Sequence, residues 1–258
     1  MGVGACGVLR VEREETRRPD PQERSLRRIQ PARRMAGARR IASLAMRLAL
    51  ALVALTLVLT LVYRVVMPVS TPMLGRWLTG QPVSREAVPF DRIAPALVRA
   101  VFTAEDQKFC MHHGIDWTAL TDVVDDEGGP SRGASTITMQ TVKNVFLWRG
   151  RSYIRKAIEI PIAMLADLLW GKRRTMEIYL NVAEWGEGVF GAEAAARHWF
   201  NKSARDLKPS EAILLAATLP NPIARNPRKP SPETRAKASR IQAAYGAMDD
   251  YIGCLGPR

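Results

Sequence analysis

The chain has 258 residues, an apolar fraction of 47% and a formal net charge of +13. Its length fits one domain of about 190 residues plus an additional segment. The charge alone would fit nucleic acid, an anionic membrane or a phosphate-bearing substrate. However, residues 1–47 carry twelve arginines against five acids, while residues 68–258 carry 25 basic against 20 acidic residues. The excess lies beside an apolar run, which favours a membrane and argues against nucleic acid as a partner.

Residues 1–40 are rich in arginine, contain Pro19, Pro21 and Pro31, and have few large apolar side chains. This composition predicts a disordered basic tail. Met35 precedes the basic pair at 39–40, so it is an alternative translation start to Met1.

Residues 41–67 are predicted to form a single transmembrane anchor. The run Leu48–Val62 is apolar without interruption, and it is shorter than the ~20 residues that span a bilayer. Arg47 and Arg64 near its two ends can reach the headgroups and extend the span. A cleaved signal peptide is the alternative, but no Ala-x-Ala site follows the run. Arginines on the N-terminal side predict a cytoplasmic N-terminus and a C-terminal domain outside. In a cell with two membranes, that is the periplasmic face of the inner membrane.

Residues 68–90 contain four prolines and are predicted to be a linker close to the membrane surface. Its apolar side chains either touch lipid or pack on the folded domain; they are Met73, Leu74, Trp77 and Leu78. The main domain is expected over 91–228, with a C-terminal helix in 229–258. Strand-like alternation is hard to find anywhere, so the fold is predicted to be mainly α.

Helical periodicity and capping residues predict the individual helices. The first leads into Glu105, where the negative end of the helix dipole suits a carboxylate to taking up a proton. A helix over 152–170 should kink at Pro161 and end at Gly171. Further helices are expected over 174–181, over 192–200, over 211–219 behind a Ser210 cap, and from Pro232 to about 251 behind a Ser231 cap.

Two dense polar clusters lie between residues 102 and 144. The first contains Glu105, Asp106, His112 and Asp116. The second is a run of small, hydroxyl, amide and basic residues from Gly133 to Asn144, which includes Ser135, Thr136, Gln140 and Lys143. Buried polar groups need hydrogen-bond partners, so this density would be unusual in a plain structural core.

The chemistry of these residues favours sugar transfer from a diphosphate. There is no metal-ligand spacing or phosphate-binding glycine loop, and Ser135 is not in a Gly-x-Ser-x-Gly elbow. The remaining acid–base candidates are Glu105, Asp106 and Glu159, and the cations Lys143, Arg155 and Lys156 could neutralise an anionic leaving group. Taken one at a time, each residue also fits a cap, a surface ion pair, a satisfied turn or a solvated helix end.

The cysteines Cys6, Cys110 and Cys254 have no metal-binding spacing. Cys6 should lie across the membrane from the other two. Cys110 and Cys254 could pair, but two separate thiols are the interpretation that we favour from the sequence alone.

Four ordered motifs make the chain resemble the family-51 peptidoglycan glycosyltransferases, in their monofunctional subgroup. The first two are Glu-Asp-x-x-Phe-x-x-His-x-Gly from Glu105 and Gly-x-Ser-Thr-Ile-Thr-x-Gln-x-x-Lys-Asn from Gly133. The third is Arg-Lys-x-x-Glu from Arg155, and the fourth is Lys172 with Tyr-Leu-Asn from Tyr179. The resemblance covers roughly residues 80–228 and implies a lysozyme-like helical domain behind the anchor, with a small lobe that dips into the bilayer.

The resemblance also implies roles for the motif residues. Glu105 would be the catalytic base that takes the proton from the GlcNAc 4-hydroxyl of the acceptor, lipid II. This oxygen would attack the growing chain on undecaprenyl diphosphate, giving a β-1,4 bond with inversion. Glu159 would be the second essential glutamate. The implied substrate-binding residues are Asp106, Ser135, Thr136, Gln140, Lys143, Asn144, Arg155 and Lys156.

Several expectations stay open at this point. No metal is assigned with certainty, although a divalent cation, Mg²⁺ or Mn²⁺, could join Glu159 to the diphosphate. Expected partners are lipid II, the lipid-linked glycan and membrane lipids, with other cell-wall synthases left open. Met139, Thr175, Asp167 and Pro161 depart from the family pattern. The alternatives are a lysozyme-like hydrolase or lytic transglycosylase, and a non-catalytic membrane-anchored scaffold. Only about 30 residues follow the motifs, so we expect no second, transpeptidase domain.

Overall fold

The structure is a computed structural model that describes residues 21–125, 135–150 and 152–256, and only the backbone of residues 21–38 and 123–125. The chain divides into two compact units, residues 1–55 and residues 56–258, and each is described by itself. The predicted disorder of residues 1–20 lies outside the described residues.

Helix α1 spans Pro21–Tyr63. Its segment Arg39–Tyr63 has 25 residues, with a mean hydropathy of 2.4 in its most apolar window, and is long and apolar enough to cross a membrane. The prediction of disorder over 21–40 is wrong for the backbone, which is helical there. The reason is local: Pro21 takes the first helical position, where proline is tolerated, and the arginines, glutamate, alanines and leucines that follow favour helix.

The predicted linker over 68–90 is instead part of the folded domain. It contains helix α2 (Thr71–Leu78) and strand β1 (Ser84–Arg85). The Ser70 hydroxyl caps α2 by accepting a hydrogen bond from the Met73 amide at 3.3 Å, and the Met73 side chain is fully buried. Leu74, Trp77 and Leu78 are exposed. Pro72 lies in the first turn of α2, where proline is tolerated, and the burial of Met73 in the core could not be predicted from the prolines.

The fold is mainly α, as predicted, and it contains a small sheet that no alternating pattern indicated. Its order is β1-β3-β2, where β2 is Glu184–Gly186 and β3 is Val189–Phe190. β1 pairs parallel to β3 with Ser84 opposite Val189, and β2 pairs antiparallel to β3. Strands of two or three residues are too short to show an alternating pattern.

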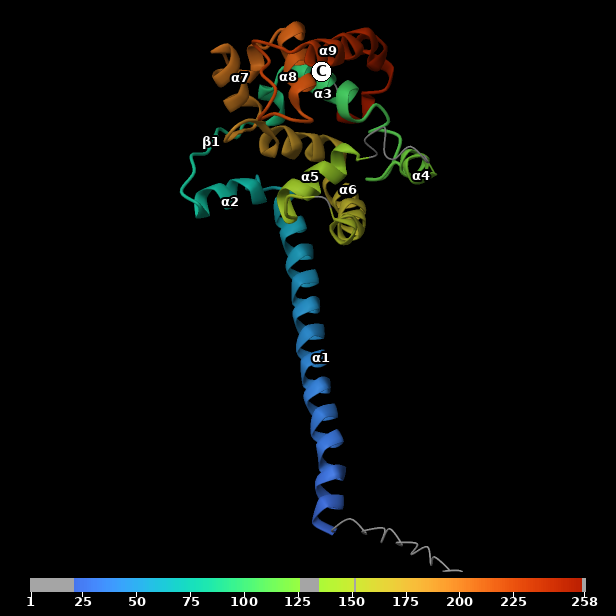
Figure 1. The fold of residues 1–258 in the computed structure, drawn as a ribbon. Coiled ribbons are helices and arrows are strands. Elements are labelled where there is room, and N and C mark those ends of the chain that lie inside the picture. Colours follow the sequence, from blue (N-terminus) through green and yellow to red (C-terminus); the bar gives the residue numbers. More distant parts are fainter. Residues whose placement is uncertain (1–20, 126–134, 151, 257–258) are drawn as a thin grey trace, which may run out of the picture. The chain divides into compact units, whose positions relative to one another are not determined.

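The helices of the domain form two groups, each around its own buried cluster (Figure 1). The first packs α3 (Pro95–Glu105) against α8 (Pro209–Thr218) and α9 (Pro232–Tyr245). The second packs α5 (Ile137–Phe146) against α6 (Tyr153–Val182). The remaining helices are α4 (Trp117–Asp125), α7 (Ala192–Phe200) and the short 3-10 turns η1 (Phe90–Arg92), η2 (Ala204–Asp206), η3 (Gly246–Asp250) and η4 (Gly253–Leu255).

The predicted helices over 93–105, 192–200 and 232–251 are confirmed as α3, α7 and α9, although α9 ends at Tyr245. Ser231 caps α9 with its side chain, as predicted. The Ser210 cap is wrong, because Pro209 occupies the first turn of α8 and Lys208 takes the cap position. In α6 the backbone stays helical through Pro161 and breaks at Gly171, whose φ of 68° and ψ of 173° lie outside the helical region.

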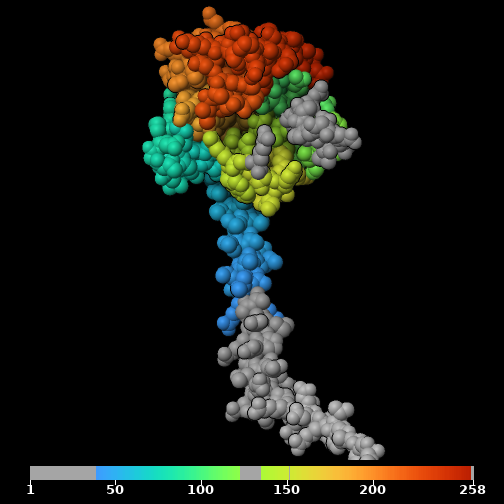
Figure 2. Space-filling model, in the orientation of Figure 1, coloured from blue at the N-terminus to red at the C-terminus, as the bar shows by residue number. Residues whose placement is uncertain are grey.

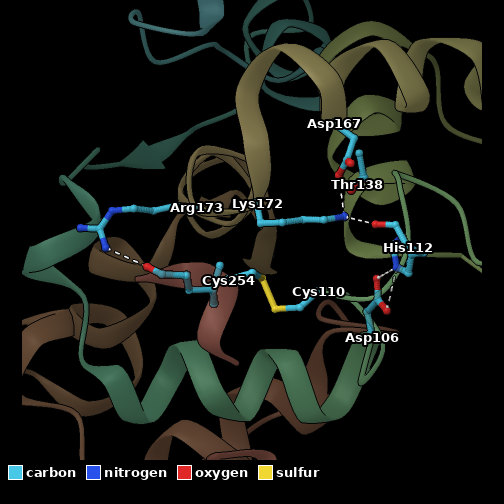
Figure 3. The surroundings of a disulfide bond; sticks show 9 residues. Asp106, Cys110, His112, Thr138, Asp167, Lys172, Arg173 and Cys254 are labelled. Carbon is cyan, nitrogen blue, oxygen red and sulfur yellow. Dashed lines mark hydrogen bonds and ion pairs between the residues drawn. A yellow bond between two sulfur atoms is a disulfide. The ribbon is translucent and has the colours of Figure 1, made fainter. Parts of the chain in front are cut away.

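A disulfide joins Cys110 to Cys254, with Cα atoms 5.6 Å apart (Figure 3). The favoured prediction of two separate thiols is therefore wrong. The two cysteines are 144 residues apart in sequence, so only the tertiary fold brings them within bonding distance. The bond ties the loop after α3 to η4 at the C-terminal end of the described chain.

Candidate active site

Glu105 is the last residue of α3, and its side chain is 11% exposed. One carboxylate oxygen, Oε2, accepts a hydrogen bond from Nε2 of Gln140 at 3.0 Å. The other, Oε1, lies 3.2 Å from Nζ of Lys237 on α9. The predicted base is thus held by one residue from the second motif and by one that belongs to none of the four motifs.

Gln140 is oriented by Tyr179, whose hydroxyl donates to Oε1 of Gln140 at 3.3 Å. Burial, with a smaller contribution from the charge of Glu105, raises the pKa of Tyr179 well above its ordinary value. Tyr179 therefore stays a neutral donor. Because the Gln140 carbonyl is engaged with Tyr179, its amide nitrogen faces Glu105.

Asp106 and Thr136, both predicted to bind substrate, are occupied inside the protein. The Asp106 carboxylate lies 3.0 Å from Nε2 of His112 and accepts the Ile137 amide hydrogen at 3.0 Å (Figure 3). The Thr136 hydroxyl donates to the Gly114 carbonyl at 2.6 Å and caps α5. These residues fix the first motif against the start of α5, which is a positioning role.

Glu159 lies on α6 with a side chain that is only 2% exposed. One oxygen is paired with Arg155, and the other is 2.8 Å from Nζ of Lys156. Lys156 also donates to the Ser135 hydroxyl at 2.9 Å. From the sequence alone, Arg155 and Glu159 could also form a solvent-exposed ion pair on the helix surface. The structure instead places Glu159 inside, as a buried carboxylate shared by two cations.

Lys143 on α5 is the third cation near Glu159. Among the described residues, no hydrogen bond or ion pair to its Nζ is found. Burial lowers the pKa of Lys143; Glu159 opposes this shift, while Arg155 and Lys156 reinforce it. A buried cation without a direct counter-ion is poorly solvated, so it would gain from an anionic ligand. The side-chain amide of Asn144, the next residue of α5, likewise has no hydrogen-bond partner among the described residues. The backbone carbonyl of Asn144 accepts a hydrogen bond from the Thr71 hydroxyl at 3.2 Å.

Lys172 and Asn181 of the fourth motif have structural contacts. Lys172 follows the break at Gly171 and donates to the His112 carbonyl and, at 2.6 Å, to Asp167 (Figure 3). Asn181 exchanges two hydrogen bonds with the backbone of Val88. These two residues of the fourth motif therefore stabilise the backbone around the site.

The surface shows the same arrangement from outside (Figure 2). Orange-to-red residues of the C-terminal helices lie over yellow-green residues of α5 and α6, and the surface is recessed where the two meet. Glu105 lies on α3, which packs against the C-terminal helices α8 and α9. Lys143 lies on α5 and Glu159 on α6.

A family model described as "Transglycosylase" matches residues 72–247. The chain belongs to the transglycosylase family. A protein of Brucella suis biovar 1 named "Biosynthetic peptidoglycan transglycosylase" is 50% identical over 217 residues, which cover 83% of this chain and 97% of that protein. Proteins with the same name are 53% identical in Rhodopseudomonas palustris strain HaA2, over 81% of this chain and 92% of theirs, and 54% identical in Rhizobium meliloti, over 73% and 80%.

The match extends the transglycosylase module beyond the predicted domain on both sides. It begins within α2 and includes all of α9. Sequence reasoning missed Lys237 as a site residue because it lies outside every motif. A lysine on the inward face of a helix, beside Thr234 and Ile241, was the available signal.

Proposed function

We propose that this transglycosylase polymerises lipid II into glycan strands, transferring a lipid-diphosphate-linked chain onto the acceptor GlcNAc 4-hydroxyl. The observation that carries this proposal is the presence of one held carboxylate, Glu105, and a separate group of three partly buried cations around the buried Glu159. Membership of the transglycosylase family and the name of its relatives support it.

Glu105 would act as the general base. Its carboxylate takes the proton of the acceptor 4-hydroxyl while that oxygen forms a bond to C1 of the donor sugar. The bond from C1 to the diphosphate breaks on the opposite face, so the α-linked donor gives a β-1,4 product, and undecaprenyl diphosphate leaves. General-base catalysis of this kind contributes roughly 10²–10⁴-fold to the rate.

Lys143, Arg155 and Lys156 would bind the donor diphosphate. Preorganised cations stabilise charge that develops on a leaving group without reorganising during the reaction. Glu159 holds Arg155 and Lys156 in place, while the Lys143 ammonium makes no hydrogen bond or ion pair within the described parts of the chain. Ser135, held by Lys156, and the amide of Asn144 complete this side of the site.

The described residues do not fit a divalent cation at Glu159. Both of its oxygens are engaged by cations, and no group of three or more His, Cys, Asp or Glu side chains with metal-binding geometry is found in the described parts of the chain. We therefore derive no step through a metal.

The chain is anchored to a membrane by the apolar segment of α1, and we propose that its catalytic domain lies on the outer side of the cytoplasmic membrane. The arginines before the span support a cytoplasmic N-terminus. The disulfide supports an oxidising location for the domain. Exposed apolar side chains of α2 and of the first half of α6 would contact lipid; they are Leu74, Trp77, Leu78, Tyr153, Ile154, Met164 and Leu168.

The test is polymerisation of labelled lipid II by the purified full-length protein and by Glu105→Gln. We expect polymer from the wild type and at least a 10²-fold slower rate from the variant. Glu233→Gln is the matched control, because it makes the same chemical change at an exposed position of α9. Clearing of finished peptidoglycan without polymer would support a hydrolase instead. Full polymerisation by Glu105→Gln would reject Glu105 as the base.

A further inference from the structure

Lys237 is the one cation in contact with Glu105 among the described residues. Its Nζ lies 3.2 Å from Oε1 of Glu105, although 132 positions separate the two in sequence. The side chains are 19% and 11% exposed. Exposed ion pairs contribute little because water screens them, whereas this pair is largely withdrawn from water.

The backbone that carries Lys237 is firmly placed. α9 packs on both α3 and α8. Its inward face contains Thr234, Ala238 and Ile241, of which Thr234 and Ile241 are buried and Ala238 packs against the first core cluster. Thr234 and Ile241 are three and four residues from Lys237, so they lie on the same side of the helix as the lysine. The lysine is therefore directed at Glu105 by the packing of its helix.

Lys237 and Gln140 hold the two oxygens of Glu105 separately. Gln140 donates to Oε2 and is itself fixed by Tyr179. Lys237 contacts Oε1. A carboxylate has about four lone-pair sites, so two donors restrict its rotation and still leave sites for an acceptor hydroxyl.

We propose that Lys237 is a positioning residue for the catalytic base, and that α9 thereby forms part of the active site. The proposal rests on the proposed role of Glu105. Lys237 acts through Glu105 by fixing the plane of its carboxylate, so that the free lone pair meets the acceptor hydroxyl. Misplacing a reacting group by about 1 Å can cost on the order of 10²-fold in rate.

The experiment compares Lys237→Met, Lys237→Arg and Arg235→Met in full-length protein, using lipid II turnover. Methionine keeps the length of the side chain but removes the charge, while arginine keeps a donor. Arg235 is exposed on the same helix and bonds only a local carbonyl, that of Pro230, so it controls for the loss of one positive charge.

We expect kcat of Lys237→Met to fall about tenfold or more with an unchanged KM for lipid II, because the lysine holds the base and not the lipid. Lys237→Arg should recover most of the loss, and Arg235→Met should match the wild type. Thermal unfolding of each variant shows whether the fold is intact.

Three outcomes would overturn the proposal. They are a folded Lys237→Met with kcat within twofold of the wild type, a raised KM at unchanged kcat, and an equal loss in the methionine and arginine variants that follows their melting temperatures. Failure of the proposed function is distinguishable, because the wild type would then form no polymer from lipid II. Failure of the proposed base is also distinguishable, because Glu105→Gln would then polymerise lipid II normally.

Discussion

At the scale of single residues, the site contains two carboxylates with different surroundings in the described part of the chain. Glu105 has two neutral or cationic donors and keeps free lone pairs. Glu159 is enclosed by Arg155 and Lys156. Hydrolysis of a neutral glycoside needs two carboxylates that flank the bond. A carboxylate neutralised by two cations is poorly suited to that second role, which favours transfer over hydrolysis.

Lys143 provides a pH-dependent test at this scale. Burial lowers its pKa below the ordinary lysine value, so its charge is lost at a lower pH than for an exposed lysine. We expect the KM for lipid II to rise on the alkaline side as Lys143 deprotonates. Lys143→Arg keeps its charge throughout and should move this rise to higher pH, whereas Lys143→Met should raise KM at every pH. A rise in KM at the same pH in wild type and Lys143→Arg would contradict this assignment.

At the scale of elements, the break in α6 gives the fourth motif its geometry. Gly171 has a positive φ that side chains other than glycine rarely adopt. The turn that follows brings Lys172 back to Asp167, five residues earlier, and to the carbonyl of His112. The first motif is also held against α6 at Gly114, where φ is 83° and an added Cβ would lie 2.7 Å from the Ala163 carbonyl.

Replacing each of these two glycines by alanine should lower the stability of the domain, and by different amounts. An added Cβ at Gly171 meets nothing within 4 Å, so Gly171→Ala should cost only the conformational strain, about 1–3 kcal/mol. Gly114→Ala adds a backbone clash to a similar strain and should cost more. Chemical denaturation of both variants measures the difference. Equal losses of stability would show that the first motif shifts to accommodate the added methyl group at no energetic cost.

The sequence predicted those features of each helix that depend on residues close together in the chain. The serine cap of α9, the periodicity of α3 and the break at Gly171 are local signals, and each was read correctly. The burial of Met73, the pairing of Glu105 with Lys237 and the disulfide depend on segments far apart in the chain, and none could be predicted. The sequence placed Asp106 and Thr136 near the site. Their inward orientation could not be predicted, because it depends on contacts with the start of α5 and with the loop at Gly114.

At the scale of the whole domain, the first half of α6 departs from the usual arrangement of an amphipathic helix. Its apolar side chains Ile154 and Leu168 are 72% and 80% exposed, while Glu159 is buried. An amphipathic helix in water normally buries its apolar face. The exposed apolar face fits a domain that works on substrates held in a bilayer.

The disulfide sets a measurable part of the domain's stability. Closing a loop of this length in the unfolded chain corresponds to roughly 2–5 kcal/mol. We expect a reductant to lower the melting temperature of the wild type, and the double variant Cys110→Ser, Cys254→Ser to melt lower and to ignore reductant. An unchanged melting temperature on verified reduction would show that the bond adds no stability.

The same bond also imposes an order on biosynthesis. Cys110 lies five residues after Glu105, and its partner emerges from the ribosome 144 residues later. The segment that contains Glu105 is therefore synthesised well before the disulfide can form. Formation of the bond has to wait for the residues beyond the family match. In the orientation proposed above, it uses the thiol oxidants outside the cytoplasmic membrane.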